Sequence, residues 1–124
     1  MSGRLYIVGL GPGDTRWLTP EAQEALSLAQ DIIGYTPYVE RVPKRLGQNR
    51  LASDNRVEID RAREALERVS TGRVVAVVSG GDPGVFAMAA AVFEAVDAGA
   101  PHWRDLDIRV MPGISAMQAA AARF

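Results

Sequence analysis

Residues 74–84, VVAVVSGGDPG, decide the fold of this chain. The first five are apolar without alternation, which is typical of a strand that is covered on both faces, as in a parallel sheet. The next six residues, SGGDPG, form a glycine-bearing loop directly after that strand. The stretch therefore predicts an α/β domain in which a central strand leads into a loop whose backbone can approach a ligand closely.

Strands and helices alternate outward from this stretch. Further strands are predicted at residues 5–8, 31–35, 51–53 and 106–110, the last with one less buried face because its apolar residues alternate with polar ones. Helices are predicted from Thr19-Pro20-Glu21 to Ala29, from Ile59 to Val69 before Thr71-Gly72, and from Val85 to about Gly99. This order predicts an open parallel sheet of about four to five strands flanked by helices, with right-handed crossovers.

Three loops fall at the carboxyl ends of predicted strands: residues 9–14, 79–84 and 111–115. Ligands of open parallel sheets bind at this edge. Proline beside glycine fixes the shape of a loop before binding and so lowers the entropy cost of ordering it. Tight turns alone would explain one such loop, but three at one edge favour a small-molecule site.

The spacing of the first loop argues against a dinucleotide. Its glycines are followed by Asp14 where the dinucleotide fingerprint has its third glycine, and a carboxylate there would repel a pyrophosphate. No Gly-Lys-Ser/Thr sequence follows, which excludes a Walker loop. A cationic or zwitterionic ligand suits Asp14 and Asp82 better, and S-adenosylmethionine is one that carries a sulfonium and no phosphate.

The composition limits the remaining classes of function. The chain has 124 residues, 48% of them hydrophobic, which fits one domain, and 14 basic against 15 acidic residues, which gives no field to hold nucleic acid. The basic stretch 41–50 is expected to be a solvated loop, with guidance of an anionic substrate as its alternative. There is no cysteine and one histidine, His102, so no metal site is expected. No apolar run is long enough to span a membrane, so we expect a cytoplasmic protein without membrane partners.

Four motifs in order resemble one known family. They are VGLGPGD at residues 8–14, LT at 18–19, SGGDP at 79–83 and PGISA at 112–116, and together they cover nearly the whole chain. This set closely resembles the tetrapyrrole methylases, which methylate precorrins on the routes to cobalamin and sirohaem. GYTPY at 34–38 and GDPGVFAMA at 81–89 are most similar to the branch that acts on C17 of precorrin-3B. Thr36 stands where the uroporphyrinogen branch usually has aspartate, which makes that branch a poor match.

The resemblance implies an S-adenosylmethionine-dependent C-methyltransferase that releases S-adenosylhomocysteine, methylates C17 of precorrin-3B with contraction of the macrocycle, and forms a homodimer. It implies cofactor contacts for Pro12, Gly80, Gly81, Asp82, Val85, Ser115 and Ala116. It places Asp14, Tyr35 and Tyr38 on the tetrapyrrole side, with Asp14 as the candidate catalytic residue for proton handling. Purely structural roles remain open for four of these residues: packing for both tyrosines, turn formation for Asp82 and helix capping for Ser115.

Two alternatives to this function remain open. The first is methylation of another substrate within the family, such as a different precorrin. The second is a non-catalytic module that binds a nucleotide-like ligand.

The resemblance also bears on domain organisation. Members of this family are roughly twice the length of this chain, which is beyond what one small domain holds. The final alanine-rich helix, expected after Ser115, runs to Phe124 without a stop signal. We therefore expect residues 1–124 to be the N-terminal domain of the tetrapyrrole methylase fold, with the C-terminal domain absent from this chain. The chain alone is expected to bind the methyl donor weakly and not to turn over.

Overall fold

The computed structural model describes residues 3–12, 18–54 and 58–113. Within them, five strands form one sheet: β1 Arg4–Gly9, β2 Asp31–Tyr35, β3 Asn49–Ser53, β4 Val74–Ser79 and β5 Asp107–Met111. Their order is β3-β2-β4-β1-β5, and every neighbouring pair is parallel. The predicted parallel sheet is therefore confirmed, with residues 74–79 as its central strand. The helix predicted after Ser115 lies outside the described residues.

The helices connect these strands. They are α1 Pro20–Leu28, α2 Thr36–Glu40, α3 Glu58–Ser70 and α4 Asp82–Ala98, with a 3-10 helix η2 at Pro101–Asp105. The predicted cap is confirmed, because the Thr19 hydroxyl oxygen accepts a hydrogen bond of 3.1 Å from the Ala22 N–H. Gly72 ends the turn after α3 at φ 94°, which a residue with a Cβ rarely adopts. The short helices α2 and η2 were not predicted, since five residues are too few for an apolar stripe.

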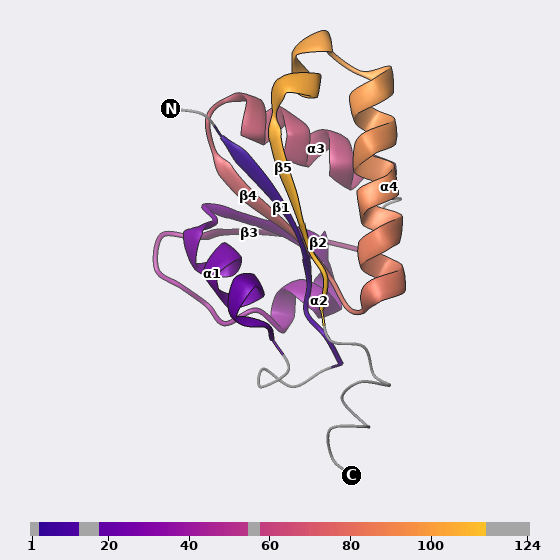
Figure 1. Ribbon diagram of the computed structural model, residues 1–124. Coiled ribbons are helices and arrows are strands. Elements are labelled where there is room, and N and C mark those ends of the chain that lie inside the picture. The colour runs from indigo at the N-terminus through magenta and orange to yellow at the C-terminus, as the bar shows by residue number, and fades with distance from the viewer. Residues whose placement is uncertain (1–2, 13–17, 55–57, 114–124) are drawn as a thin grey trace.

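Helices cover both faces of the sheet. Figure 1 shows α3 and α4 on one side of the strands and α1 on the other. Successive residues of a strand point to opposite faces, so β1 sends Leu5 and Ile7 towards α3 and α4, and Tyr6 and Val8 towards α1. The inner strands are thus buried on both sides, which explains their continuous apolar runs.

The edge strand β5 is the exception. Ile108 and Val110 pack against the core shared with α3 and α4, whereas Arg109 on the other face is exposed. The predicted strand with one less buried face is confirmed. Within the described residues β5 pairs with β1 alone, and on the face opposite α3 and α4 its Met111 packs against the core while Arg109 is exposed.

A buried carboxylate holds the amino ends of three strands together. Asp31, at the start of β2, is fully buried and accepts two hydrogen bonds from Arg73, at 2.6 and 2.8 Å, and one from Asn49 at 2.9 Å. Burial by itself would raise the pKa of Asp31, but these hydrogen bonds and the charges of Arg73 and Arg68 together lower that pKa below its usual value. This cluster fixes the edge of the sheet opposite the glycine loops.

Candidate functional site

The strand order creates a switch point between β1 and β4. These strands are neighbours, yet the chain leaves β1 towards α1 on one face and leaves β4 towards α4 on the other. Ligands of open α/β sheets bind in the crevice that such divergent connections leave at the carboxyl edge. The first and second glycine loops follow these two strands, and the third follows β5, which adjoins β1. The structure therefore brings all three predicted loops to adjacent strand ends.

The first and third loops pack backbone to backbone. A Cβ on Gly113 would lie 2.9 Å from the Gly11 nitrogen and 3.0 Å from the Gly9 oxygen, and a Cβ on Gly9 would lie 2.6 Å from the Gly113 nitrogen. Gly11 itself has φ 74°. Glycine is required at these positions because the two backbones approach too closely for side chains.

The first loop is also tied to β4. The Leu10 N–H donates a hydrogen bond of 2.8 Å to the Ser79 carbonyl oxygen, at the point where β4 ends. Beyond Ser79, the chain passes Gly80 and enters α4 with Gly81 as N-cap, whose carbonyl accepts the Val85 N–H at 2.9 Å. The loops at this edge are thus a connected framework.

Tyrosines line the side of the site next to β2. Tyr35 ends β2, Tyr38 lies in α2, and their rings meet edge to face with centroids 5.6 Å apart. Both rings line a small cavity of about 110 Å³, whose other lining residues are Glu58, Arg61, Val78, Ser79, Gly84 and Met88. The structure therefore gathers both predicted substrate-facing tyrosines beside the second glycine loop.

The other predicted site residues divide into three groups. Pro12 is half-buried at the described end of the first loop, and Gly80 and Gly81 are half-buried between β4 and α4. Val85 is fully buried in the core beneath the loops, where its Cγ2 would lie 2.8 Å from a Cβ on Gly9. Asp82 begins α4, but its side chain lies outside the described part, as do Asp14, Ser115 and Ala116 entirely.

Two arginines of the basic stretch 41–50 donate hydrogen bonds to backbone carbonyls, and one of them reaches the first glycine loop. Arg41, which follows α2, donates from Nη2 to the carbonyl oxygens of Gly11 at 2.6 Å and Leu10 at 3.4 Å. Arg50 donates from Nη2 to the Val39 carbonyl oxygen. The prediction of a solvated loop at residues 41–50 is therefore wrong for these two side chains, although Lys44 and Arg45 are exposed. The error has a local cause: the unpredicted helix α2 turns Arg41 back towards the first loop.

Arg61 is the third residue that the sequence did not single out. It is buried in α3, donates to the backbone oxygen and hydroxyl of Ser53 at 3.2 and 3.3 Å, and lies over the Tyr35 ring at 5.9 Å. Its position in the sequence could have marked it: Arg61 lies one turn before Ala65, on the side of α3 that carries the buried apolar residues.

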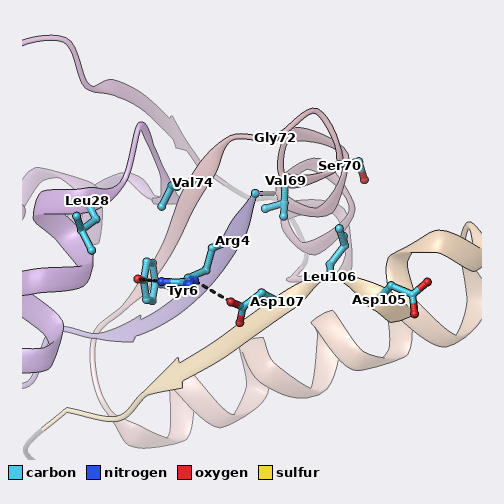
Figure 2. Close-up of a pocket in the computed structure, with 11 residues that line it drawn as sticks. Arg4, Tyr6, Leu28, Val69, Ser70, Gly72, Val74, Asp105, Leu106 and Asp107 are labelled. Carbon is cyan, nitrogen blue, oxygen red and sulfur yellow. Dashed lines mark hydrogen bonds and ion pairs between the residues drawn. The ribbon is translucent and has the colours of Figure 1, made fainter. Parts of the chain in front are cut away.

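A larger hollow of about 560 Å³ lies at the opposite, amino edge of the sheet. Figure 2 shows Arg4 between Tyr6 and Asp107, with Val69 and Ser70 of α3 on another wall. Hydrogen bonds to Tyr6, at 3.0 Å, and to Asp107, at 2.8 Å, raise the pKa of Arg4 above its usual value. No described residue of the three glycine loops lines this hollow, so we assign the candidate site to the carboxyl edge.

The described ranges contain no group of three His, Asp or Glu side chains placed to hold a metal ion. No described helix combines the length and the apolar character that a membrane span requires.

The fold and the loops define the chain as a parallel α/β domain with a small-molecule site at its switch point. The family profile of the tetrapyrrole (corrin/porphyrin) methylases matches residues 4–124. The chain belongs to this family, as its motifs indicated.

Three individual relatives are similar to this chain over nearly all of its length. The chain is 54% identical over 124 residues to a precorrin-3B C(17)-methyltransferase of a Sinorhizobium species, covering all of this chain and 49% of that protein. The sequence is also 54% identical to that of the methyltransferase CobJ. The crystal structure of CobJ matches this fold with a TM-score of 0.89, over 98% of this chain and 51% of that one. A uroporphyrin-III C-methyltransferase of Thermus thermophilus complexed with S-adenosylhomocysteine matches at 25% identity and TM-score 0.68, over 96% of this chain and 52% of that one. The chain thus spans about half the length of these relatives.

Proposed function

We propose that this chain forms half of the active site of an S-adenosylmethionine-dependent methyltransferase that methylates C17 of precorrin-3B, with contraction of the ring, in cobalamin biosynthesis. One observation carries the proposal. Three glycine loops meet at the switch point of the sheet, in a chain that is 54% identical along its whole length to a relative of that activity.

The charges of the loops fit this methyl donor better than a phosphate ligand. Residues 9–14, 79–84 and 111–115 contain two aspartates and no lysine or arginine. These loops carry no basic side chain of their own for a pyrophosphate, whereas the sulfonium and ammonium of S-adenosylmethionine are attracted to carboxylates. Because Gly9, Gly11 and Gly113 have no side chains, their backbones pack closely together at the base of the proposed site.

The site residues are assigned within this proposal by their motifs. Contacts to the cofactor come from Gly80, Gly81 and Asp82 after β4, from Pro12 after β1, and from Ser115 and Ala116 after β5. Val85, fully buried beneath Gly9, supports these loops from below. The donor supplies an activated methyl group on a positively charged sulfur. A nucleophilic ring carbon forms the new C–C bond as the C–S bond breaks, and S-adenosylhomocysteine leaves. The task of the protein is to hold the two reactants in line and to exclude water.

The tetrapyrrole is assigned to the side next to β2. Tyr35 is 40% exposed and can offer its ring to the macrocycle, while Tyr38 packs behind it. Asp14 is the candidate for the proton transfers that ring contraction demands.

The remainder of the proposal concerns the whole protein. We propose that residues 1–124 are its N-terminal domain, that a C-terminal domain completes the cleft, and that the full-length enzyme is a cytoplasmic homodimer. The support is the length of the relatives, of which this chain covers 49% and 51%. The chain by itself is expected to bind the donor weakly and to show no turnover.

Calorimetry and a methyl-transfer assay on the full-length protein test this function. We expect S-adenosylhomocysteine to bind and the methyl group of S-adenosylmethionine to appear on precorrin-3B. Tight binding of NAD or ATP without binding of S-adenosylhomocysteine would instead support a nucleotide-binding module. Preferred methylation of a different precorrin would keep the family chemistry and correct the substrate.

A further inference from the structure

We propose that Arg41 is a positioning residue that holds the first glycine loop in the conformation required by the methyl donor. The inference rests on the proposed function, because it assigns a purpose to a side chain at the same site. Arg41 follows α2 and reaches across 30 positions of sequence to the loop after β1.

The geometry of the contact is specific to the backbone of this loop. Nη2 of Arg41 donates to the Gly11 oxygen at 2.6 Å and to the Leu10 oxygen at 3.4 Å. The peptide between Gly11 and Pro12 has no N–H, so the Gly11 oxygen is its only hydrogen-bonding atom. Glycine at φ 74° also gives this peptide freedom to rotate. Among the interactions described, the bond from Arg41 is therefore what sets the direction of this peptide.

The same side chain connects two parts of the site. The Arg41 N–H bonds the Tyr38 carbonyl oxygen at 3.1 Å, and the Tyr38 ring covers Gly80 of the second loop. The first loop is in turn bonded to Ser79 through the Leu10 N–H. Arg41 thus connects α2 with the first loop, which is itself bonded to the end of β4.

One guanidinium nitrogen of Arg41 remains unpaired in this arrangement. Nε of Arg41 is buried and has no hydrogen-bond partner among the residues that the structure describes. A buried N–H without a partner is unfavourable for folding, so such groups call for an explanation in a native protein. The explanation offered by the geometry is that the guanidinium is placed for the two loop carbonyls, at the expense of Nε.

Arg50 provides a matched control for the test. Its Nη2 also donates to a backbone carbonyl, that of Val39, and its Nη1 is also buried without a partner in the described part of the chain. The bond of Arg50, however, is to α2 and not to a glycine loop. Loss of Arg50 therefore removes the same kind of interaction from the same region and leaves the first loop held.

The experiment compares wild type, Arg41→Ala, Arg41→Lys and Arg50→Ala in the full-length protein. The dissociation constant of S-adenosylhomocysteine is measured by calorimetry and the melting temperature by calorimetric scanning. We expect Arg41→Ala to weaken binding about tenfold, which is the scale of one charge-assisted hydrogen bond. Arg41→Lys keeps a cation that can reach one of the two carbonyl oxygens. Its dissociation constant should therefore lie between those of Arg41→Ala and wild type. Arg50→Ala should lower the melting temperature and leave the dissociation constant unchanged.

The outcomes separate this inference from the proposed function. If wild type fails to bind S-adenosylhomocysteine, the proposed function fails. If wild type binds and Arg41→Ala binds equally well, or if Arg50→Ala weakens binding as much as Arg41→Ala, only the role of Arg41 is overturned. Should Arg41→Ala not fold, Arg41→Lys decides: binding as tight as in wild type contradicts the inference.

Discussion

The ring of Tyr38 lies directly over Gly80, so that a Cβ on Gly80 would be 2.8 Å from Cε1 of the tyrosine. This contact brings α2 against the loop that begins α4, and it joins the tyrosine side of the site to the second glycine loop. The relationship depends on glycine because a methyl group at that distance would overlap the ring.

Replacement of Gly80 by alanine is expected to destabilise the protein by about 1–3 kcal/mol through this overlap. The ring must move, since its bonded atoms cannot bend away. Removal of the ring should relieve the strain, so Gly80→Ala is expected to cost less in a Tyr38→Ala background. Urea denaturation of the two single variants and the double variant measures the coupling. Strictly additive effects would contradict the contact.

Asp31→Asn is expected to lower the free energy of unfolding by about 2 kcal/mol, because it weakens the charged hydrogen bonds that the buried carboxylate accepts from Arg73. Asp107→Asn serves as the control. Asp107 also pairs with an arginine, Arg4, but its side chain is 38% exposed, so solvent screens the interaction and a smaller loss is expected. Equal losses in urea denaturation would show that burial of Asp31 does not matter.

The stability contributed by Asp31 should depend on pH. Its folded-state pKa lies below the usual value, so the contribution is complete above the unfolded-state pKa of about 3.9 and is lost as pH falls through the folded-state value. The urea midpoints of wild type and Asp31→Asn are therefore expected to differ most near neutral pH and to converge in acid. A difference that grows on acidification would have the wrong sign.

Thr19→Ala should cost about 1 kcal/mol of stability, since it removes the side-chain acceptor of the Ala22 N–H at the start of α1. Ser27→Ala, at an exposed position within the same helix, is the comparison. Ser27 bonds the carbonyl of Glu24, which a helix can leave to water, and alanine is the better helix former. Chemical denaturation should therefore show a loss only for Thr19→Ala.

Several features were predictable because they are local. The continuous apolar run at residues 74–78 predicted a strand buried on both faces, and the Thr19-Pro20 pair predicted the start of α1. The glycine loops could be assigned to one edge of the sheet because parallel strands bring their carboxyl ends together. Four motifs in order were enough to identify the family.

Other features depend on partners that are distant in sequence. Nothing near Arg41 marks it as a partner of Gly11, and nothing near Tyr38 marks it as a cover for Gly80. Asp31 could not be recognised as buried, because its partners Asn49 and Arg73 come from two other strand ends. Such contacts follow from the order β3-β2-β4-β1-β5, which hydrophobic patterns do not specify.

The sequence by itself determined the longer helices, the strands of the parallel sheet and the family, because periodicity, capping residues and glycine spacing act over a few neighbouring residues. Only the tertiary structure decided which strands are neighbours and hence that the connections diverge between β1 and β4. It also decided that a basic stretch expected in solvent turns two arginines onto backbone carbonyls. The physical reason is that a buried guanidinium is stable only where acceptors from other segments meet it, and packing alone brings those segments together.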